Sequence, residues 1–181
     1  MITRESTLAD VCFAVSYALQ THGMSAVLTG GSAAAVYAPA AYASYDADFV
    51  LERDEPLEAV GDALVSIGFE RHGKARIFVH PESLFTIDFP SGPLAVGGDY
   101  VHETAILTKG DVTLRILSPT DCVRDRLAHF YHWDDFTALN AAVAVAAANI
   151  GNLNMDLLRS WSKREDKLDK LTEFERRLAL I

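Results

Sequence analysis

The chain has 181 residues, of which 50% are hydrophobic and 23% charged. This composition excludes disordered, collagen-like and low-complexity proteins, and it predicts one domain or a small core with an appendage. The 16 Lys and Arg residues stand against 25 Asp and Glu, a net charge of −9 that disfavours bulk nucleic-acid binding through phosphate contacts. Most of the acidic excess lies in residues 1–90, with five basic and twelve acidic side chains.

Neither a membrane span nor an export signal is expected. The longest apolar stretch, residues 139–150, contains two Asn and is well short of the roughly 20 residues that a bilayer requires. The charged residues near the N-terminus interrupt any secretory apolar segment. Cys12 and Cys122 fall in apolar helical patterns, which favours reduced thiols over a disulfide framework. We therefore expect a cytoplasmic protein.

Helix and strand patterns alternate through the first two thirds of the chain. A helix is expected after Thr7, whose spacing to Asp10 matches a capping box, and it ends at Gly23. The apolar run 25–29 predicts a strand, Gly30-Gly31 a turn and segment 32–37 a short helix. A helix is expected at 56–67, and strands at 47–51, 76–79, 84–89, 101–107 and 112–117. These elements predict a mixed sheet flanked by helices, an α/β arrangement of the α+β class.

Composition changes after Leu117. Ser118-Pro119-Thr120-Asp121 is typical of a helix start, with Pro at the first helical position, and the pattern stays helical to the end. We divide the chain into an α/β core, residues 1–117, and a C-terminal helical region, residues 118–181. The helical region should pack on the core, because apolar faces need cover at Val123, Leu127, Phe130, Leu139 and Val143.

Two aspartates on one predicted strand are the most informative feature. Because side chains two residues apart in a strand point to the same face, Asp46 and Asp48 would project side by side. Such carboxylates repel each other unless a divalent cation bridges them, and Mg²⁺ accepts a few carboxylates together with phosphate oxygens. A third carboxylate, Asp88, stands between Ile87 and Phe89, where a charge is costly to place.

Each carboxylate also has an ordinary structural explanation. Asp46 could cap a turn, Asp48 could pair with an arginine, and Asp88 could end an edge strand before Pro90. The functional interpretation therefore depends on their combination with the glycine turn Gly30-Gly31-Ser32, which thirteen residues separate from Asp46.

That combination resembles the nucleotidyltransferase superfamily of polymerase-β-like fold. Its pattern is an apolar strand, Gly-Gly or Gly-Ser, a short connection, Asp-x-Asp and a later carboxylate among apolar residues. Ser118-Pro119-Thr120-Asp121 with Arg126 is similar to the Ser-Pro-x-Asp and downstream Lys of the abortive-infection toxin-like and minimal branches. Asp134-Asp135, expected in the next helix, is similar to their Lys-Asp or Arg-Asp element. The matches span residues 25–140.

The sequence departs from the family pattern at two positions. Arg126 replaces the usual Lys, and Tyr42 stands where a basic residue often precedes the aspartate pair. Phosphate contacts are therefore less well matched than the carboxylates.

The resemblance implies a role for each matched residue. Asp46, Asp48 and Asp88 would be the catalytic and metal-binding residues, holding Mg²⁺ or Mn²⁺, with Asp88 next to the acceptor hydroxyl. Gly30, Gly31 and Ser32 would bind the phosphates of a nucleoside triphosphate through backbone N–H groups and a hydroxyl. Arg126 would offset the charge of the triphosphate from the helical region.

Two functions follow from this pattern. The first is a metal-dependent nucleotidyltransferase that moves a nucleoside monophosphate (NMP) from a nucleoside triphosphate (NTP) to a tRNA, protein or small-molecule acceptor, with toxin–antitoxin membership and a homodimer or antitoxin-like partner as options. The second is an inactive nucleotide-binding or partner-binding module of the same fold. The three carboxylates favour the enzyme, and the missing basic residues favour the module.

Two weaker signals lie in the helical region. His129 and His132 are three residues apart, but zinc needs more ligands, so we expect His129 to pack or to lie at the rim of the active site. Segment 163–177 mixes six basic and five acidic residues with apolar residues at helical spacing. It predicts a helix that docks on its own domain or across a dimer, with capture of a partner as the alternative.

Overall fold

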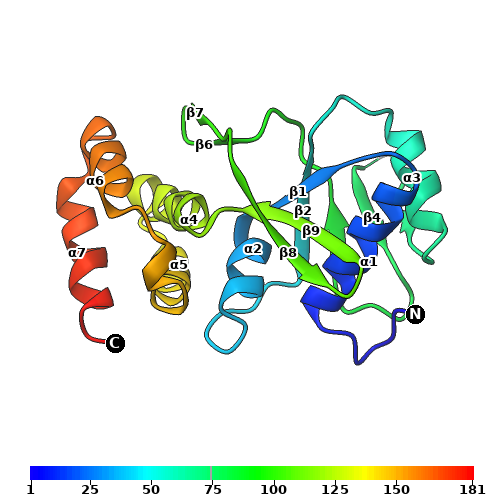
Figure 1. Cartoon of the computed structure of the whole chain (residues 1–181), viewed down its shortest axis with the longest axis horizontal. Helices are drawn as coiled ribbons and strands as arrows, with labels where there is room; N and C mark the ends of the chain where they lie inside the picture. The colour runs from blue at the N-terminus through cyan, green and yellow to red at the C-terminus, as the bar shows by residue number, and fades with distance from the viewer. Residues whose placement is uncertain (74) are drawn as a thin grey trace.

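Seven strands form a mixed sheet in the computed structural model, which describes residues 1–73 and 75–181 (Figure 1). At its centre, β1 (Ala26–Thr29) lies between antiparallel β2 (Asp46–Leu51) and parallel β9 (Val112–Leu117). Beyond β2 follow β5 (Thr86–Asp88), β4 (Ile77–Val79) and β3 (Glu70–Arg71), and beyond β9 lies β8 (Thr104–Lys109). The mixed sheet flanked by helices confirms the predicted α+β class.

Two helices cover one face of this sheet. They are α1 (Leu8–Thr21) and α3 (Leu57–Val65), which pack against each other and are seen together in Figure 1. The capping box predicted at Thr7 is present, since its side chain accepts from the Asp10 backbone and the Asp10 side chain accepts from the Thr7 backbone. Buried residues of α1, α3 and the covered sheet face form one apolar core, which includes Val15, Leu64, Phe49 and Ile87.

The short helix α2 (Gly30–Tyr37) connects β1 to β2 and contacts both the sheet and the helical region. Its last residue, Tyr37, donates its hydroxyl to the Leu117 carbonyl at 2.7 Å. Leu117 is the last residue of β9 and of the core, so this bond joins the end of α2 to the residue that precedes the helical region.

The helical region contains α4 (Pro119–Trp133), α5 (Phe136–Ala148), a 3₁₀ turn (Ile150–Asn152), α6 (Met155–Arg164) and α7 (Leu168–Leu178). Ser118 caps α4 with Pro119 at its start, as predicted. The apolar residues expected to be covered are all buried: Val123, Leu127, Phe130, Leu139 and Val143. Segment 163–177 packs on its own chain, with Leu171 and Phe174 buried against the other tail helices.

The Asp134-Asp135 pair differs from its expected place inside a helix. Asp134 ends α4 with a left-handed backbone, φ 52°, and Asp135 caps α5 by accepting from the N–H groups of Thr137 and Ala138. Two adjacent short polar side chains favour caps over helix interiors, and here they separate two helices.

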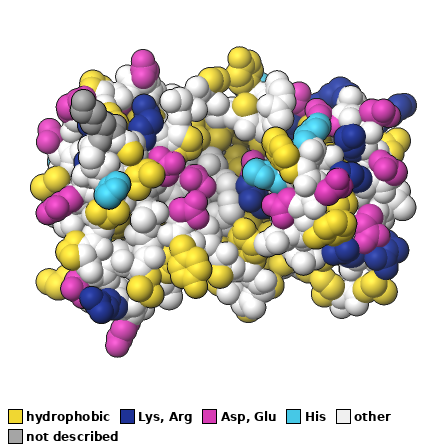
Figure 2. All heavy atoms as spheres, turned by 180° about the vertical axis from the view of Figure 1, so that it is seen from behind, with side chains coloured by type: hydrophobic (Ala, Val, Ile, Leu, Met, Phe, Trp, Pro, Cys, Tyr) yellow, Lys and Arg dark blue, Asp and Glu magenta, His cyan; other side chains and the backbone are white. Residues whose placement is uncertain are grey.

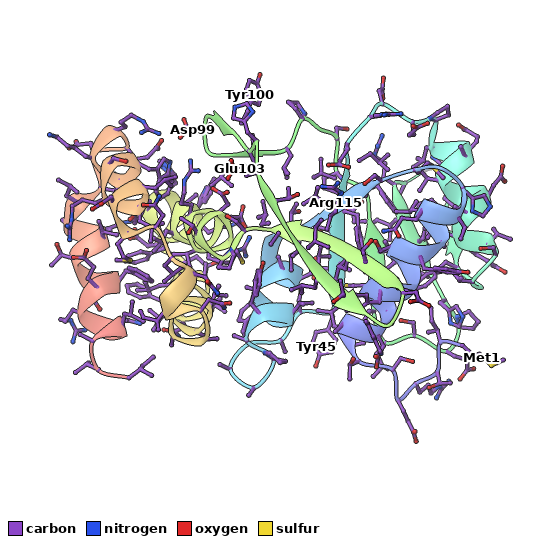
Figure 3. The ribbon with its side chains drawn as sticks, viewed as in Figure 1. Met1, Tyr45, Asp99, Tyr100, Glu103 and Arg115 are labelled. Carbon is purple, nitrogen blue, oxygen red and sulfur yellow. The ribbon has the colours of Figure 1, made fainter. Side chains whose placement is uncertain are left out.

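A hairpin of β6 (Ala95–Val96) and β7 (Asp99–Tyr100) leaves the sheet and reaches the helical region. Each of its strands has two residues, too few to show alternation in the sequence. Asp99 accepts a hydrogen bond from Arg124 of α4 at 2.8 Å and another from Arg164 of α6. In Figure 3 Asp99 lies on the side of the hairpin that faces the tail helices.

Other differences from the sequence prediction are small. Strands β5 and β8 are shifted or shortened by two or three residues, and the two-residue β3 was missed. Cys12 and Cys122 are both buried, and burial raises the pKa of each thiol. Within residues 1–73 and 75–181, none of the helices is long and apolar enough to cross a membrane.

Candidate active site

The three predicted carboxylates come from two neighbouring parallel strands. Asp48 of β2 is the register partner of Asp88 of β5, and Asp46 is the partner of Thr86. Side chains of register partners in a parallel pair point to the same face, and so do residues two apart on one strand. Asp46, Asp48 and Asp88 therefore share the sheet face opposite α1 and α3.

The glycine turn lies directly beside Asp48. Thr29, the last residue of β1, is the register partner of Asp48, and Gly30 follows with φ +64°. A Cβ atom at Gly30 would stand 2.6 Å from Oδ2 of Asp48, so only glycine allows the carboxylate to approach the start of α2 so closely. The first backbone N–H groups of α2 thus start next to an acidic side chain, at a helix end suited to anions.

Ser32 has a different role from the one predicted. It is fully buried, donates its hydroxyl to the Thr29 carbonyl at 2.7 Å and accepts from the Asp48 N–H at 3.2 Å. The hydroxyl proton is therefore directed into the protein and not toward a phosphate. Ser32 positions Asp48 by joining α2 to β2.

Electrostatics confirm that the carboxylates influence one another. Burial raises the pKa of Asp48 to about 6, and the charges of Asp46 and Asp88 add to this effect. Asp125 of α4 contributes in the same direction, while Arg126 opposes it. Asp48 is thus a carboxylate whose charge is costly unless a cation comes close.

The carboxylates do not yet surround a single point. Asp46 accepts a hydrogen bond from the Ser44 hydroxyl at 2.9 Å, while Asp48 is turned toward Gly30. Among the described residues, no three His, Cys, Asp or Glu side chains are grouped closely enough to hold a metal ion. Carboxylate oxygens are the ligands that Mg²⁺ and Mn²⁺ prefer, and these three carboxylates share one sheet face.

A pocket of about 510 Å³ opens on this sheet face. We call it the active-site pocket; its lining comprises Thr29, Gly30, Gly31, Tyr42, Ser44, Asp46, Asp48, Val50, Pro90, Ser91, Pro93, Leu94, Ala95, Leu117, Asp125, Arg126 and His129. Figure 2 shows a hollow near the middle of this view, with acidic side chains on both sides of it. Asp88 lies outside the lining that the described residues form, beside Asp48.

Arg126 faces the glycine turn from α4, as predicted. Its Nη1 atom would be 3.6 Å from a Cβ at Gly31, and the residue is 8% exposed. Asp125 accepts from its Nε at 3.0 Å and its Nη2 at 2.6 Å. Burial lowers the pKa of Arg126, but the Asp125 carboxylate outweighs burial, and the resulting pKa lies above its ordinary value. The one predicted cation of the pocket is therefore already paired.

Three lining features were missed or only partly found from the sequence. Asp125 immediately precedes Arg126 in the middle of α4, and an arginine next to an acid in a helix is too common to signal a site. Tyr42 takes the place of a basic residue, and its hydroxyl would be 3.1 Å from a Cβ at Gly31. His129 lies at the rim as expected, because it follows Arg126 by three residues on the same helix face.

Comparison of the sequence with protein-family models, and of the chain with curated proteins and solved structures, finds no match.

Proposed function

We propose that the chain is a metal-dependent nucleotidyltransferase that moves an NMP from an NTP to an acceptor, in the cytoplasm. One observation carries the proposal: Asp48 and Asp88 are register partners on parallel strands, with Asp46 on the same face, and the start of α2 lies directly beside them. Metal-binding carboxylates next to an anion-binding helix start are what a triphosphate with its cation requires.

Each residue of the pocket then has a chemical task. The N–H groups of Gly30 and Gly31 donate to phosphate oxygens, and Arg126 adds positive charge from α4. Asp46 and Asp48 hold the Mg²⁺ or Mn²⁺ ion, which when bound neutralises the charge of the phosphates. Asp88 accepts the proton of the acceptor hydroxyl as its oxygen bonds to the α-phosphorus and the bond to pyrophosphate breaks.

A second candidate, an inactive nucleotide-binding or partner-binding module, has one observation in its favour. Arg126 donates from Nε and Nη2 to one oxygen, Oδ2, of Asp125, and Tyr42 occupies the position of a basic residue. With fewer unpaired basic side chains in the pocket, a triphosphate would be bound more weakly during the reaction.

Isothermal titration with NTP and Mg²⁺, followed by transfer of labelled NMP in a cell extract, separates the two candidates. The enzyme predicts Mg²⁺-dependent binding together with a labelled acceptor, which is a tRNA, a protein or a small molecule by its size. Both signals should be lost in the double variant Asp46→Asn with Asp48→Asn and kept in Asp62→Asn, which removes an exposed carboxylate of α3. Binding without transfer would identify the module.

A further inference from the structure

A second pocket, of about 390 Å³, shares a wall with the active-site pocket. The shared wall is the segment after β5, with Pro90, Ser91 and Pro93 lining both pockets. We call it the arginine pocket; its remaining lining comprises Leu51, Glu52, Arg53, Asp54, Arg76 and Gly92. It therefore begins where β2 and β5, the two strands that carry the carboxylates, end.

Arg76 is held in this pocket by the backbone. Its Nε donates to the Phe89 carbonyl, and its own carbonyl accepts from the Phe89 N–H at 3.2 Å. Phe89 directly follows Asp88, so the guanidinium is anchored one residue from the third carboxylate. Nε is used for anchoring, and among the described residues the two terminal nitrogens have no hydrogen-bond or ion-pair partner, which leaves them for carboxylate or phosphate oxygens.

Arg53 and Arg76 differ from most basic residues of this chain in having no carboxylate at ion-pair distance among the described residues. Acidic residues exceed basic ones by nine, and most described Lys and Arg side chains have a carboxylate at ion-pair distance. In the part of the chain that the structure describes, the exceptions are Arg53, Arg76, Lys163 and Lys167. Two of these four cations line the same pocket, beside the active-site pocket.

The acidic residues of the arginine pocket leave these cations available. The Glu52 carboxylate lies 3.6 Å from Nε of Arg115, so it forms an ion pair with a residue of β9. Asp54 is exposed and adds one negative charge to the rim. Two guanidinium groups against one unpaired carboxylate give the pocket a positive local charge in an acidic protein.

We infer that the arginine pocket binds a carboxylate or phosphate group of the acceptor, and that the acceptor is a small anionic molecule. The role as acceptor subsite rests on the proposed transferase activity; the binding of an oxyanion does not. Asp48 and Leu51 are three residues apart on β2, and a rise of about 3.3 Å per residue puts about 10 Å between the metal-binding carboxylates and the pocket. The acceptor thus carries its anionic group about 10 Å from its reacting hydroxyl, within the reach of a small molecule.

The binding step is tested with inorganic phosphate and with malonate as probes, in the presence of a chelator and without nucleotide, by isothermal titration. We expect one bound probe per chain, with affinity lowered about tenfold in Arg53→Gln and in Arg76→Gln. Arg53 is exposed and makes no ion pair with a described residue, so we expect Arg53→Gln to fold. This variant therefore tests the pocket even if Arg76→Gln fails to fold. The matched control is Arg159→Gln, on the distant α6. A preference for phosphate or for malonate distinguishes the two anion sources.

Two outcomes would overturn the inference. One is equal probe affinity in Arg53→Gln and the parent protein. The other is loss of binding only in Arg126→Gln, which would place the anion in the active-site pocket. Once a labelled acceptor is found, Arg53→Gln should raise the KM for that acceptor about tenfold and leave the KM for NTP unchanged. Absence of transfer in the parent protein would contradict the proposed transferase activity. It would not affect the oxyanion site, which the titration with phosphate and malonate tests separately.

Discussion

Gly30 and Asp48 are so close that a single methyl group at Gly30 would collide with the carboxylate, 2.6 Å from its Oδ2. The contact joins the turn after β1 to β2, the strand that carries Asp46 and Asp48. It makes the space above Gly30 part of the site, since the position of Asp48 depends on that space remaining empty.

Replacing Gly30 by alanine should therefore damage both the fold and the site. A left-handed alanine costs about 1–2 kcal/mol, and the collision with Asp48 adds to this cost. Gly23→Ala is a matched control, because Gly23 also has a left-handed backbone, φ +74°, and nothing lies within 4 Å of its Cβ position. Thermal unfolding should show a larger loss for Gly30→Ala, and Mg²⁺-dependent NTP binding should fail only in that variant. Equal effects of the two substitutions would contradict the contact.

Asp48 should make the site sensitive to acid. Its pKa is raised to about 6, so the carboxylate takes up a proton as the pH falls through 6. Protons then compete with the cation, and Mg²⁺ affinity should fall about tenfold per pH unit below that value. Titration of Mg²⁺ from pH 5 to pH 8 measures this dependence. In Asp48→Asn the inflection near pH 6 should be absent.

The same shift predicts how Asp48 affects stability. The folded pKa of about 6 exceeds the ordinary aspartate pKa of 3.8, so the folded state binds more protons between these values, and stability falls as the pH rises through this range. Above pH 6 the charge of Asp48 opposes folding. After allowance for its partial exposure, Asp48→Asn should increase the free energy of unfolding at pH 7 by about 1–2 kcal/mol. Urea denaturation at pH 7.5 and at pH 4 should show this gain at the higher pH alone; Asp62→Asn serves as the control.

Arg126 should contribute to NTP binding despite its ion pair with Asp125. Loss of one charge-assisted phosphate contact costs about 1.5–3 kcal/mol, a ten- to hundredfold loss of affinity. Arg126→Gln should show this loss in titrations with NTP and Mg²⁺, and Arg126→Lys should retain part of the binding. If Arg126→Gln binds as tightly as the parent, α4 only covers the pocket.

Asp99 should hold the hairpin of β6 and β7 on the helical region. Its carboxylate accepts from Arg124, which is 5% exposed, and from Arg164, whose side chain is 58% exposed. Asp99→Asn should lower the free energy of unfolding by about 1–2 kcal/mol, because the buried guanidinium of Arg124 loses a charged partner. Arg164→Gln should change it by less than about 0.5 kcal/mol, since an exposed ion pair contributes little. Chemical denaturation compares the two variants.

The sequence predicted those parts of the site that depend on local periodicity. Alternation along residues 46–49 placed Asp46 and Asp48 on one face, and the scarcity of cations in residues 1–90 pointed to Arg126. The adjacency of Asp88 to Asp48 follows only from the order of the strands in the sheet. β2 pairs with β5, although two other strands, β3 and β4, lie between them in the sequence. The role of Ser32 could not be read from its neighbours, since a hydroxyl at a helix start can turn inward or outward. The arginine pocket brings residues 51–54 together with 76 and 90–93, and only tertiary contacts place them together.

The two buried cysteines give the molecule its own probes of unfolding. Cys12 lies in α1 of the core and Cys122 in α4 of the helical region, each with a thiol that burial keeps protonated. Alkylation therefore requires an opening of the surrounding structure, and the labelling rate of each thiol reports the free energy of its own opening. Because Asp99 of the hairpin binds Arg124 and Arg164, and α2 packs on α4 and α5, the two thiols should become reactive together. Mass spectrometry after timed alkylation would then find chains labelled at both positions or at neither. Chains labelled at Cys122 alone would mean that the helical region opens by itself. Such an opening would remove Arg126 from the pocket that Asp46 and Asp48 line.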